Sequence, residues 1–185
     1  MKTLKIFVWL SLFITLTASQ CFKRQHDPYA DLPAATQTGR GIFACHINGK
    51  SFIGRPYNCF YQYNYGRGRH YLAVRGDDRS YKGSTEMPWV VSFGSNMDIH
   101  EGMILYLSTG PDSLDHARAH CFYTDKDEHS WDTHTDSTHT GEVHITKFDT
   151  HNYILSGTFW FDVVHPLTGE IVEVRDGRFD VKFSR

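Results

Sequence analysis

The sequence has no excess of positive charge. Its 185 residues include 19 lysine and arginine residues against 21 aspartate and glutamate residues, which gives a formal net charge of −2 at pH 7. A protein that holds nucleic acid needs a basic surface to neutralise the phosphates. The lack of such a surplus argues against nucleic acid as a partner.

Cysteine is scarce, and its spacing excludes two kinds of site. The four cysteines are Cys21, Cys45, Cys59 and Cys121, and no pair forms a C-x-x-C motif. This pattern excludes a thioredoxin-like redox site and a zinc knuckle. If Cys21 is modified, at most one disulfide can form among the other three in an oxidising compartment. The sequence leaves its pairing open.

Sequence motifs of hydrolytic enzymes are missing as well. The chain contains neither the G-x-S-x-G nucleophile elbow nor an S-x-x-K motif. His100-Glu101 is followed by Gly102 and Met103 without the second histidine of H-E-x-x-H, so this zinc motif is not formed. We therefore assign no catalytic residue and expect a protein that is not an enzyme.

No hydrophobic run is long enough to cross a bilayer as a helix. The apolar run Ile6–Leu16 follows two lysines and precedes the small and polar residues 17–20, after which comes Cys21. This layout predicts a signal peptide over residues 1–20. A cysteine at the expected cleavage point predicts a lipid anchor on its sulfur, as in bacterial lipoproteins. The alternative is an ordinary secreted protein that is cut near Ala18.

After the signal peptide, the sequence divides into a tether and a domain. Residues 21–40 contain Pro28 and Pro33 and show no hydrophobic period, so we expect a flexible tether there. Residues 41–185 are enough for one domain with a substantial core.

Short runs of β-branched and aromatic residues, separated by glycine-rich turns, predict about nine or ten strands. Asn48-Gly49 and Asp176-Gly177 are strong hairpin signals, and only Ser113–His120 has the pattern of a short helix. The sequence therefore predicts an all-β fold, either an antiparallel β-sandwich or a partly closed barrel. Its expected core includes Phe159, Phe161, Phe179, Val181 and Phe183.

Distinctive strings occur near both ends of the expected mature chain. They are L-P-A-A-T-Q-T-G (Leu32–Gly39) with Phe43, Cys45 and N-G-K (Asn48–Lys50), then L-S-G-T-F-W-F (Leu155–Phe161), H-P-L-T-G-E (His165–Glu170) and D-G-R-F-D-V-K-F (Asp176–Phe183). Together they resemble an uncharacterised family of envelope lipoproteins from Bacteroidota, a domain of unknown function. The resemblance implies an all-β domain behind a lipid anchor, and it supplies no catalytic residue.

Histidines are concentrated between His116 and His151, which suggests a metal site. His116 and His120 are four residues apart and would share one side of a helical turn. His129 and His134 belong to a series of histidines spaced five residues apart. Residues at this spacing do not share a face of a strand or of a helix, so these two could approach His116 and His120 only from a loop over residues 125–140. The four side chains would suit zinc. The alternative is a solvated polar loop that happens to be rich in histidine.

A tyrosine-rich stretch is the second candidate site. Its candidate ligand-binding residues are Tyr57, Tyr61, Tyr63, Tyr65, Arg67 and Arg69. Tyrosine and arginine are the residue types that anchor partners, and flat rings can stack on sugars. This composition suggests a glycan or protein ligand, and the alternative is an aromatic sheet face whose hydroxyl groups reach water.

From these observations we expect a non-enzymatic lipoprotein of the cell envelope, exported by its signal peptide and held on the periplasmic side or at the outer membrane. Its β-domain would bind a ligand or partner, or serve a structural role. The second hypothesis is a metal-binding protein or metal-dependent hydrolase that uses the histidine-rich segment 116–151.

Overall fold

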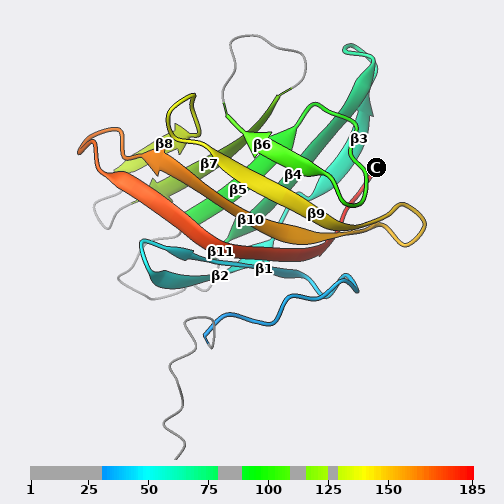
Figure 1. The fold of residues 1–185 in the computed structure, drawn as a ribbon, viewed down its shortest axis with the longest axis horizontal. Helices are drawn as coiled ribbons and strands as arrows, with labels where there is room; N and C mark the ends of the chain where they lie inside the picture. The colour runs from blue at the N-terminus through cyan, green and yellow to red at the C-terminus, as the bar shows by residue number, and fades with distance from the viewer. Residues whose placement is uncertain (1–30, 79–88, 109–115, 125–128) are drawn as a thin grey trace, which may run out of the picture. The chain divides into compact units, whose positions relative to one another are not determined.

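A computed structural model describes residues 31–78, 89–108, 116–124 and 129–185, which all belong to one compact unit, residues 31–185. These residues form eleven strands in one mixed, mostly antiparallel sheet and include no helix (Figure 1). The strands are β1 (Ile42–Ile47), β2 (Lys50–Pro56), β3 (Phe60–Asn64), β4 (Arg69–Asp77), β5 (Trp89–Ser95), β6 (Ile104–Leu107), β7 (Ala117–Thr124), β8 (Ser130–His134), β9 (Gly141–Asp149), β10 (Ile154–Val164) and β11 (Ile171–Lys182). The expected all-β class is confirmed.

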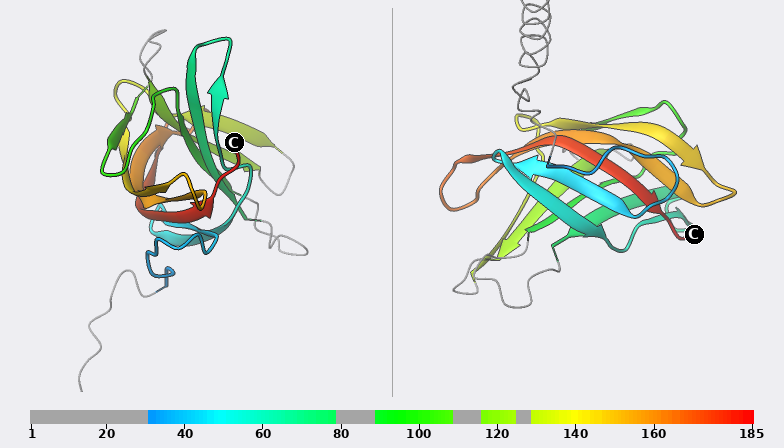
Figure 2. Two further views of the ribbon diagram at one scale, coloured as in Figure 1. Left: turned by 90° about the vertical axis from the view of Figure 1, so that its right-hand side faces the viewer. Right: turned by 90° about the horizontal axis from the view of Figure 1, so that it is seen from below.

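The sheet curls partly round its core without forming a barrel (Figure 2). Its strand order is β2-β1-β11-β10-β9-β6-β7-β5-β4-β3, and β8 pairs with the edge of β7. Two contacts in this ring are slight. β6 and β7 meet in a single parallel pair, Leu107 with Ala117, and β2 touches β4 through only two pairs. The sheet is therefore partly closed, as one of the two expected architectures has it, but it is not a barrel.

The core consists of aromatic and aliphatic side chains that point inward from the strands around the ring. The five expected core residues, Phe159, Phe161, Phe179, Val181 and Phe183, are each at most 5% exposed, so this prediction is confirmed. The ring centroids of Phe159 and Phe43 are 5.1 Å apart. Burying a phenylalanine side chain stabilises a fold by about 1.5–3 kcal/mol relative to leaving it in water.

One of the two hairpin signals behaves as expected. Asn48 and Gly49 join β1 to β2, and both have positive φ, 49° and 75°. This is the backbone geometry that a two-residue turn between twisted strands requires.

The second hairpin prediction, at Asp176-Gly177, is wrong, because β11 continues through both residues. The register with β10 passes from Phe159–Gly177 to Phe161–Val174, so β11 carries one extra residue there. Asp176 has a φ of 55°, which places the Asp-Gly pair in a β-bulge rather than a turn. A Cβ atom on Gly177 would lie 2.5 Å from the carbonyl oxygen of Phe159, so the strand tolerates only glycine at this point.

The expected helix over Ser113–His120 is also wrong for its described part, because residues 117–120 belong to strand β7. Ala117, Ala119 and Cys121 point into the core, and this alternation is the period of a strand. The expected loop over residues 125–140 contains strand β8, which pairs with β7. Residues 125–128 of that expected loop lie outside the described part of the chain.

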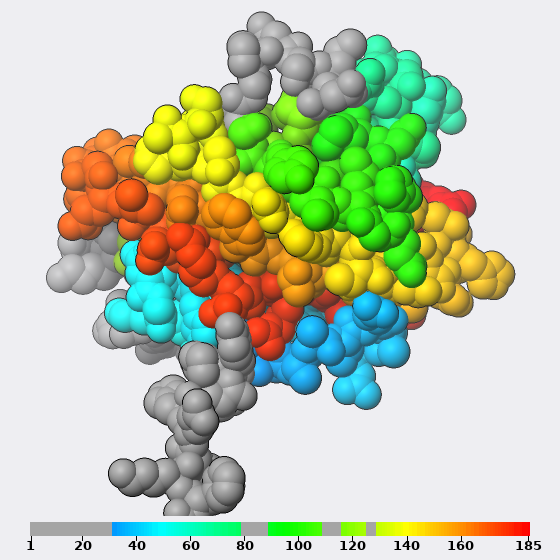
Figure 3. Space-filling view, viewed as in Figure 1, coloured from blue at the N-terminus to red at the C-terminus, as the bar shows by residue number. Residues whose placement is uncertain are grey.

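Residues 36–40, which the sequence placed in the tether, lie against β11 (Figure 3). The Asp180 carboxylate accepts hydrogen bonds from the Thr36 hydroxyl group and from the backbone amides of Thr38, Gly39 and Arg40. Asp180 is fully buried and also accepts a bond from an inner hydroxyl, that of Ser156, at 2.7 Å. Burial alone would raise the pKa of Asp180, but these hydrogen bonds lower it to about 2.

A second contact fixes the start of the same segment. His46 is 8% exposed, and its ring lies between two carboxylates. Its Nε2 atom is 3.2 Å from Asp31 and its Nδ1 atom is 3.0 Å from Asp176. The Arg178 guanidinium group also donates a hydrogen bond to the Pro33 carbonyl oxygen, so residues 31–40 are attached to the domain at several points. Residues 1–30, with the expected signal peptide and Cys21, lie outside the described part of the chain.

Cys45, Cys59 and Cys121 are buried free thiols, so the structure contains no disulfide among these three. Burial raises the pKa of each thiol. Within the described ranges, no helix is long and apolar enough to cross a membrane.

Candidate functional site

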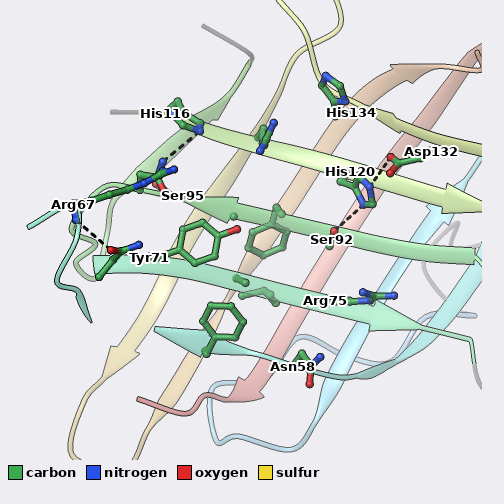
Figure 4. A pocket seen from close by; sticks show the side chains of 18 residues that line it. Asn58, Arg67, Tyr71, Arg75, Ser92, Ser95, His116, His120, Asp132 and His134 are labelled. Carbon is green, nitrogen blue, oxygen red and sulfur yellow. Dashed lines mark hydrogen bonds and ion pairs between the residues drawn. The ribbon is translucent and has the colours of Figure 1, made fainter. Parts of the chain in front are cut away.

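A cavity of about 1070 Å³ lies on the outer face of the sheet, over β3, β4, β5, β7 and β8 (Figure 4). Successive residues of a strand point to opposite faces, so these strands send alternate side chains into the core and into the cavity. We call it the outer-face cavity. It is lined by Asn58, Phe60, Asn64, Arg67, Tyr71, Ala73, Val74, Arg75, Ser92, Phe93, Gly94, Ser95, Asn96, His116, Arg118, His120, Asp132 and His134.

Four polar residues from four strands form one row across this cavity. Arg75 of β4 pairs with Ser92 of β5, Ser92 pairs with His120 of β7, and His120 pairs with His134 of β8. Residues that pair directly across strands point to the same face, with Cβ atoms about 4.5–5.5 Å apart. The row therefore places a guanidinium group, a hydroxyl group and two imidazoles side by side.

His120 is held by partners on both of its ring nitrogens. Its Nε2 atom is 2.6 Å from an Asp132 carboxylate oxygen, and its Nδ1 atom is 3.3 Å from the Ser92 hydroxyl oxygen. Figure 4 shows both contacts as dashed lines. A carboxylate that accepts from one ring nitrogen fixes the orientation and tautomer of the imidazole.

The order of these three groups is that of a serine–histidine–aspartate triad with the two ring nitrogens exchanged. Two features indicate that Ser92 and Asp132 orient His120 and argue against nucleophilic catalysis by Ser92. Ser92 lies inside β5, which is paired on both sides, so the backbone amides around it serve the sheet rather than an oxyanion. The Asp132 side chain is 61% exposed, whereas the aspartate of a working triad is buried.

Positive charge dominates the lining. Arg67, Arg75 and Arg118 all line the cavity, and none of their guanidinium groups contacts a carboxylate of a described residue. The Arg75 Nε atom is buried without a hydrogen-bond partner among those residues, and its guanidinium carbon lies 5.9 Å from the centre of the Tyr57 ring. Against three arginines, the cavity lining has one acidic side chain, Asp132.

Aromatic rings cover the side of the cavity formed by β3 and β4. The ring centroids of Phe60 and Tyr71 are 5.6 Å apart. Tyr71 reaches across β5, because a Cβ atom on Gly94 would lie 3.3 Å from the tyrosine hydroxyl oxygen. Tyr71 is 39% exposed, so part of its ring remains available to a ligand.

The structure disperses the tyrosine-rich site that the sequence suggested. Tyr61 is 9% exposed, and its ring stacks on His70 at 4.5 Å, away from the cavity. Tyr63 and Tyr65 form an exposed pair near the β3–β4 turn, with ring centroids 5.1 Å apart. Of the six candidates, only Arg67 lines the cavity.

Tyr57 and Arg69 complete the placement of those candidates. Tyr57 is 41% exposed and lies beside Arg75 at the cavity's edge, and Arg69 is half-buried at the start of β4.

The candidate metal ligands are only partly brought together. His116, just before β7, and His120 of β7 both line the cavity, and His134 joins them from β8. His129 is exposed just before β8 and does not line the cavity. Over the ranges that the structure describes, no group of three or more histidine, cysteine, aspartate or glutamate side chains is placed to hold a metal ion.

Sequence reasoning missed most of the cavity. Arg75, Ser92 and Arg118 were not among the candidate residues, because they lie on three strands and meet only through the register of the sheet. A local signal existed for β7, where Arg118 and His120 alternate with Ala117 and Ala119.

The fold and the cavity define an all-β domain with a cationic site on the outer face of its sheet. Residues 106–181 match a family described as a domain of unknown function (DUF6252). The matched segment includes Arg118, His120, Asp132 and His134 of the cavity. It begins after Arg75 and Ser92 and therefore does not include them. No curated protein and no solved structure matches the chain.

Proposed function

We propose that this protein is a non-enzymatic binding protein of the cell envelope and that its outer-face cavity binds an anionic ligand. The observation that carries the proposal is the set of three arginines in one cavity, Arg67, Arg75 and Arg118, without a carboxylate partner among the described residues. Guanidinium groups form strong, often bidentate hydrogen bonds with carboxylate, sulfate or phosphate oxygens.

The charge of the whole chain supports a specific site. The formal net charge is −2, so the positive cavity is a local feature of a slightly acidic protein. A long polyanion such as nucleic acid would meet repulsion beyond the cavity, whereas a small or short anion would contact the arginines alone.

The envelope location is the second part of the proposal, and it rests on the sequence. The layout of residues 1–20 and the position of Cys21 support export and a lipid anchor. In bacteria that produce the protein, radiolabelled palmitate should enter the wild type and should not enter Cys21→Ser. Labelling of both proteins, or of neither, would contradict the anchor.

Calorimetric titration of the purified full chain with citrate and with inorganic phosphate tests the binding function. We expect saturable binding that weakens with added salt, and we expect Arg118→Ala to weaken it by roughly tenfold or more. Arg40→Ala is the matched control, because Arg40 is exposed and lies outside the cavity lining. Absence of saturable binding to either anion, or an equal loss in Arg40→Ala, would contradict the proposal.

A further inference from the structure

We propose that the ligand of the outer-face cavity is an acidic oligosaccharide. One of its sugar rings would lie on Tyr71 and Phe60, and its carboxylate or sulfate group would pair with Arg118. This inference rests on the proposed anion-binding function and names the class of ligand.

The first argument is a cross-strand row that joins the aromatic side of the cavity to its cationic side. Phe60 of β3 pairs with Ala73 of β4, Ala73 pairs with Gly94 of β5, and Gly94 pairs with Arg118 of β7. The two central residues are small, and the Tyr71 ring leans over Gly94, so an aromatic surface extends from Phe60 toward the Arg118 guanidinium group. The row spans three strand spacings, roughly 14 Å. That length suits an extended ligand that carries both a flat apolar surface and a negative charge.

The second argument is the size and polarity of the cavity. A volume of about 1070 Å³ is far more than one inorganic anion needs. Asn58, Asn64, Asn96 and Ser92 also line the cavity and add amide and hydroxyl groups to it. Amide and hydroxyl groups both donate and accept hydrogen bonds, which matches the many hydroxyl groups of a sugar. A hydrophobic acid would instead favour an enclosed apolar pocket.

The third argument separates a saccharide from other polymers. Peptides that bind to sheets commonly pair their main chain with an open strand edge. This cavity lies on a sheet face, where β4 and β5 are already paired on both sides. A nucleic acid strand carries a phosphate at every nucleotide and therefore needs a continuous basic track. Here the cavity contains Asp132 beside its arginines, and the chain as a whole is slightly acidic, so such a track is not offered.

The test is a titration of the full chain with five probes. They are a tetramer of galacturonic acid, a sulfated tetrasaccharide, a neutral glucose tetramer, a single-stranded oligonucleotide and inorganic phosphate. We expect at least one of the two acidic tetramers to bind tighter than phosphate and to compete with it, and the comparison of these two tells which acidic group is preferred. The neutral tetramer should bind at least roughly tenfold more weakly than the preferred acidic one.

Three variants of the same residue isolate the contribution of the ring. Tyr71→Ala and Tyr71→Leu should each weaken binding of the acidic tetramer by roughly five- to tenfold, while Tyr71→Phe should stay within about twofold of the wild type. Tyr71→Leu keeps an apolar cover over Gly94, so it separates loss of the flat ring from loss of folding, and thermal melting of each variant checks the fold.

Several outcomes would overturn this inference while leaving anion binding intact. They are Arg118-dependent binding of phosphate with no competition from either acidic tetramer, tighter binding of the oligonucleotide than of both tetramers, and unchanged affinity in Tyr71→Leu. If none of the charged probes binds, the proposed function fails as well.

Discussion

The Asp132 carboxylate lies 2.6 Å from Nε2 of His120 and is the acidic side chain of an otherwise cationic cavity. It orients the imidazole, but it also occupies a ring nitrogen that an anionic ligand could use. The same contact therefore both organises the site and opposes its ligand. The balance between these effects can be measured.

We predict that Asp132→Asn increases the affinity for citrate by roughly two- to fivefold. The substitution makes the cavity more positive whether His120 is protonated or neutral, because it removes a full negative charge. The amide oxygen of asparagine can still accept a hydrogen bond from Nε2. Calorimetric titration at low and high salt measures the change. A lower affinity in the variant would mean that the orientation or charge of His120 outweighs the repulsion from Asp132.

We predict that Ser92 does not act as a nucleophile, although its hydroxyl oxygen is 3.3 Å from Nδ1 of His120. The backbone amides near Ser92 are committed to pairing with β4 and β7, so a tetrahedral oxyanion would lack its usual donors. A fluorophosphonate probe should leave the protein unlabelled, as judged by intact mass. Labelling that disappears in Ser92→Ala would show that the three residues form a working triad.

We predict a specific acid sensitivity from Asp180. Its pKa of about 2 lies below the ordinary value of a carboxyl group, so its bonds stabilise the fold fully above about pH 4 and less as the pH falls through 2. At pH 7 Asp180→Asn should cost at least about 2 kcal/mol in the free energy of unfolding. It should also speed amide exchange at Thr38, Gly39 and Arg40, which bond to this carboxylate.

Chemical denaturation of both proteins between pH 2 and pH 7 measures this dependence. The stability difference between wild type and Asp180→Asn should shrink as the pH falls from 4 to 2. Glu170→Gln, at an exposed position, serves as the control and should match the wild type throughout. A difference that stays constant with pH would contradict the assignment of the charge to Asp180.

We predict that the three described thiols, Cys45, Cys59 and Cys121, react only after unfolding. All three are buried, and burial raises their pKa values, so the reactive thiolate form is suppressed. With Cys21→Ser to remove the remaining thiol, Ellman's reagent should find no fast-reacting group in the native protein and three groups in guanidinium. A native thiol that reacts within seconds, or fewer than three groups after unfolding, would contradict this arrangement.

Local patterns were sufficient to predict the class of fold and much of its core. Asn48-Gly49 identified a hairpin, and alternation in Phe179, Val181 and Phe183 identified the inward face of the last strand. The same local reasoning failed at Asp176-Gly177, because an Asp-Gly pair supplies positive φ to a bulge as readily as to a turn. Only the pairing of β11 with β1 and β10 distinguishes the two cases.

The candidate site was harder to predict because it depends on long-range pairing. Arg75 and His120 are 45 positions apart in sequence, and Ser92 lies between them only because β5 pairs with both β4 and β7. Asp180 alternates in sequence with the core residues Phe179 and Val181, yet it is fully buried, since residues 36–40 cover it. Neither relationship has a local signature in the sequence.

The most direct test of the central claim is a nuclear magnetic resonance titration of the isotope-labelled full chain with citrate, followed at each backbone amide. Binding in the outer-face cavity predicts that the largest shifts occur at Arg75, Ser92, Gly94, Arg118 and His120. They should saturate together, and in Arg118→Ala the shifts at the other four positions should need roughly tenfold more citrate or more to saturate. Saturating shifts centred instead on the outer face of β6, β9 and β10, or no saturable shifts at all, would contradict the assignment of this cavity as the ligand site.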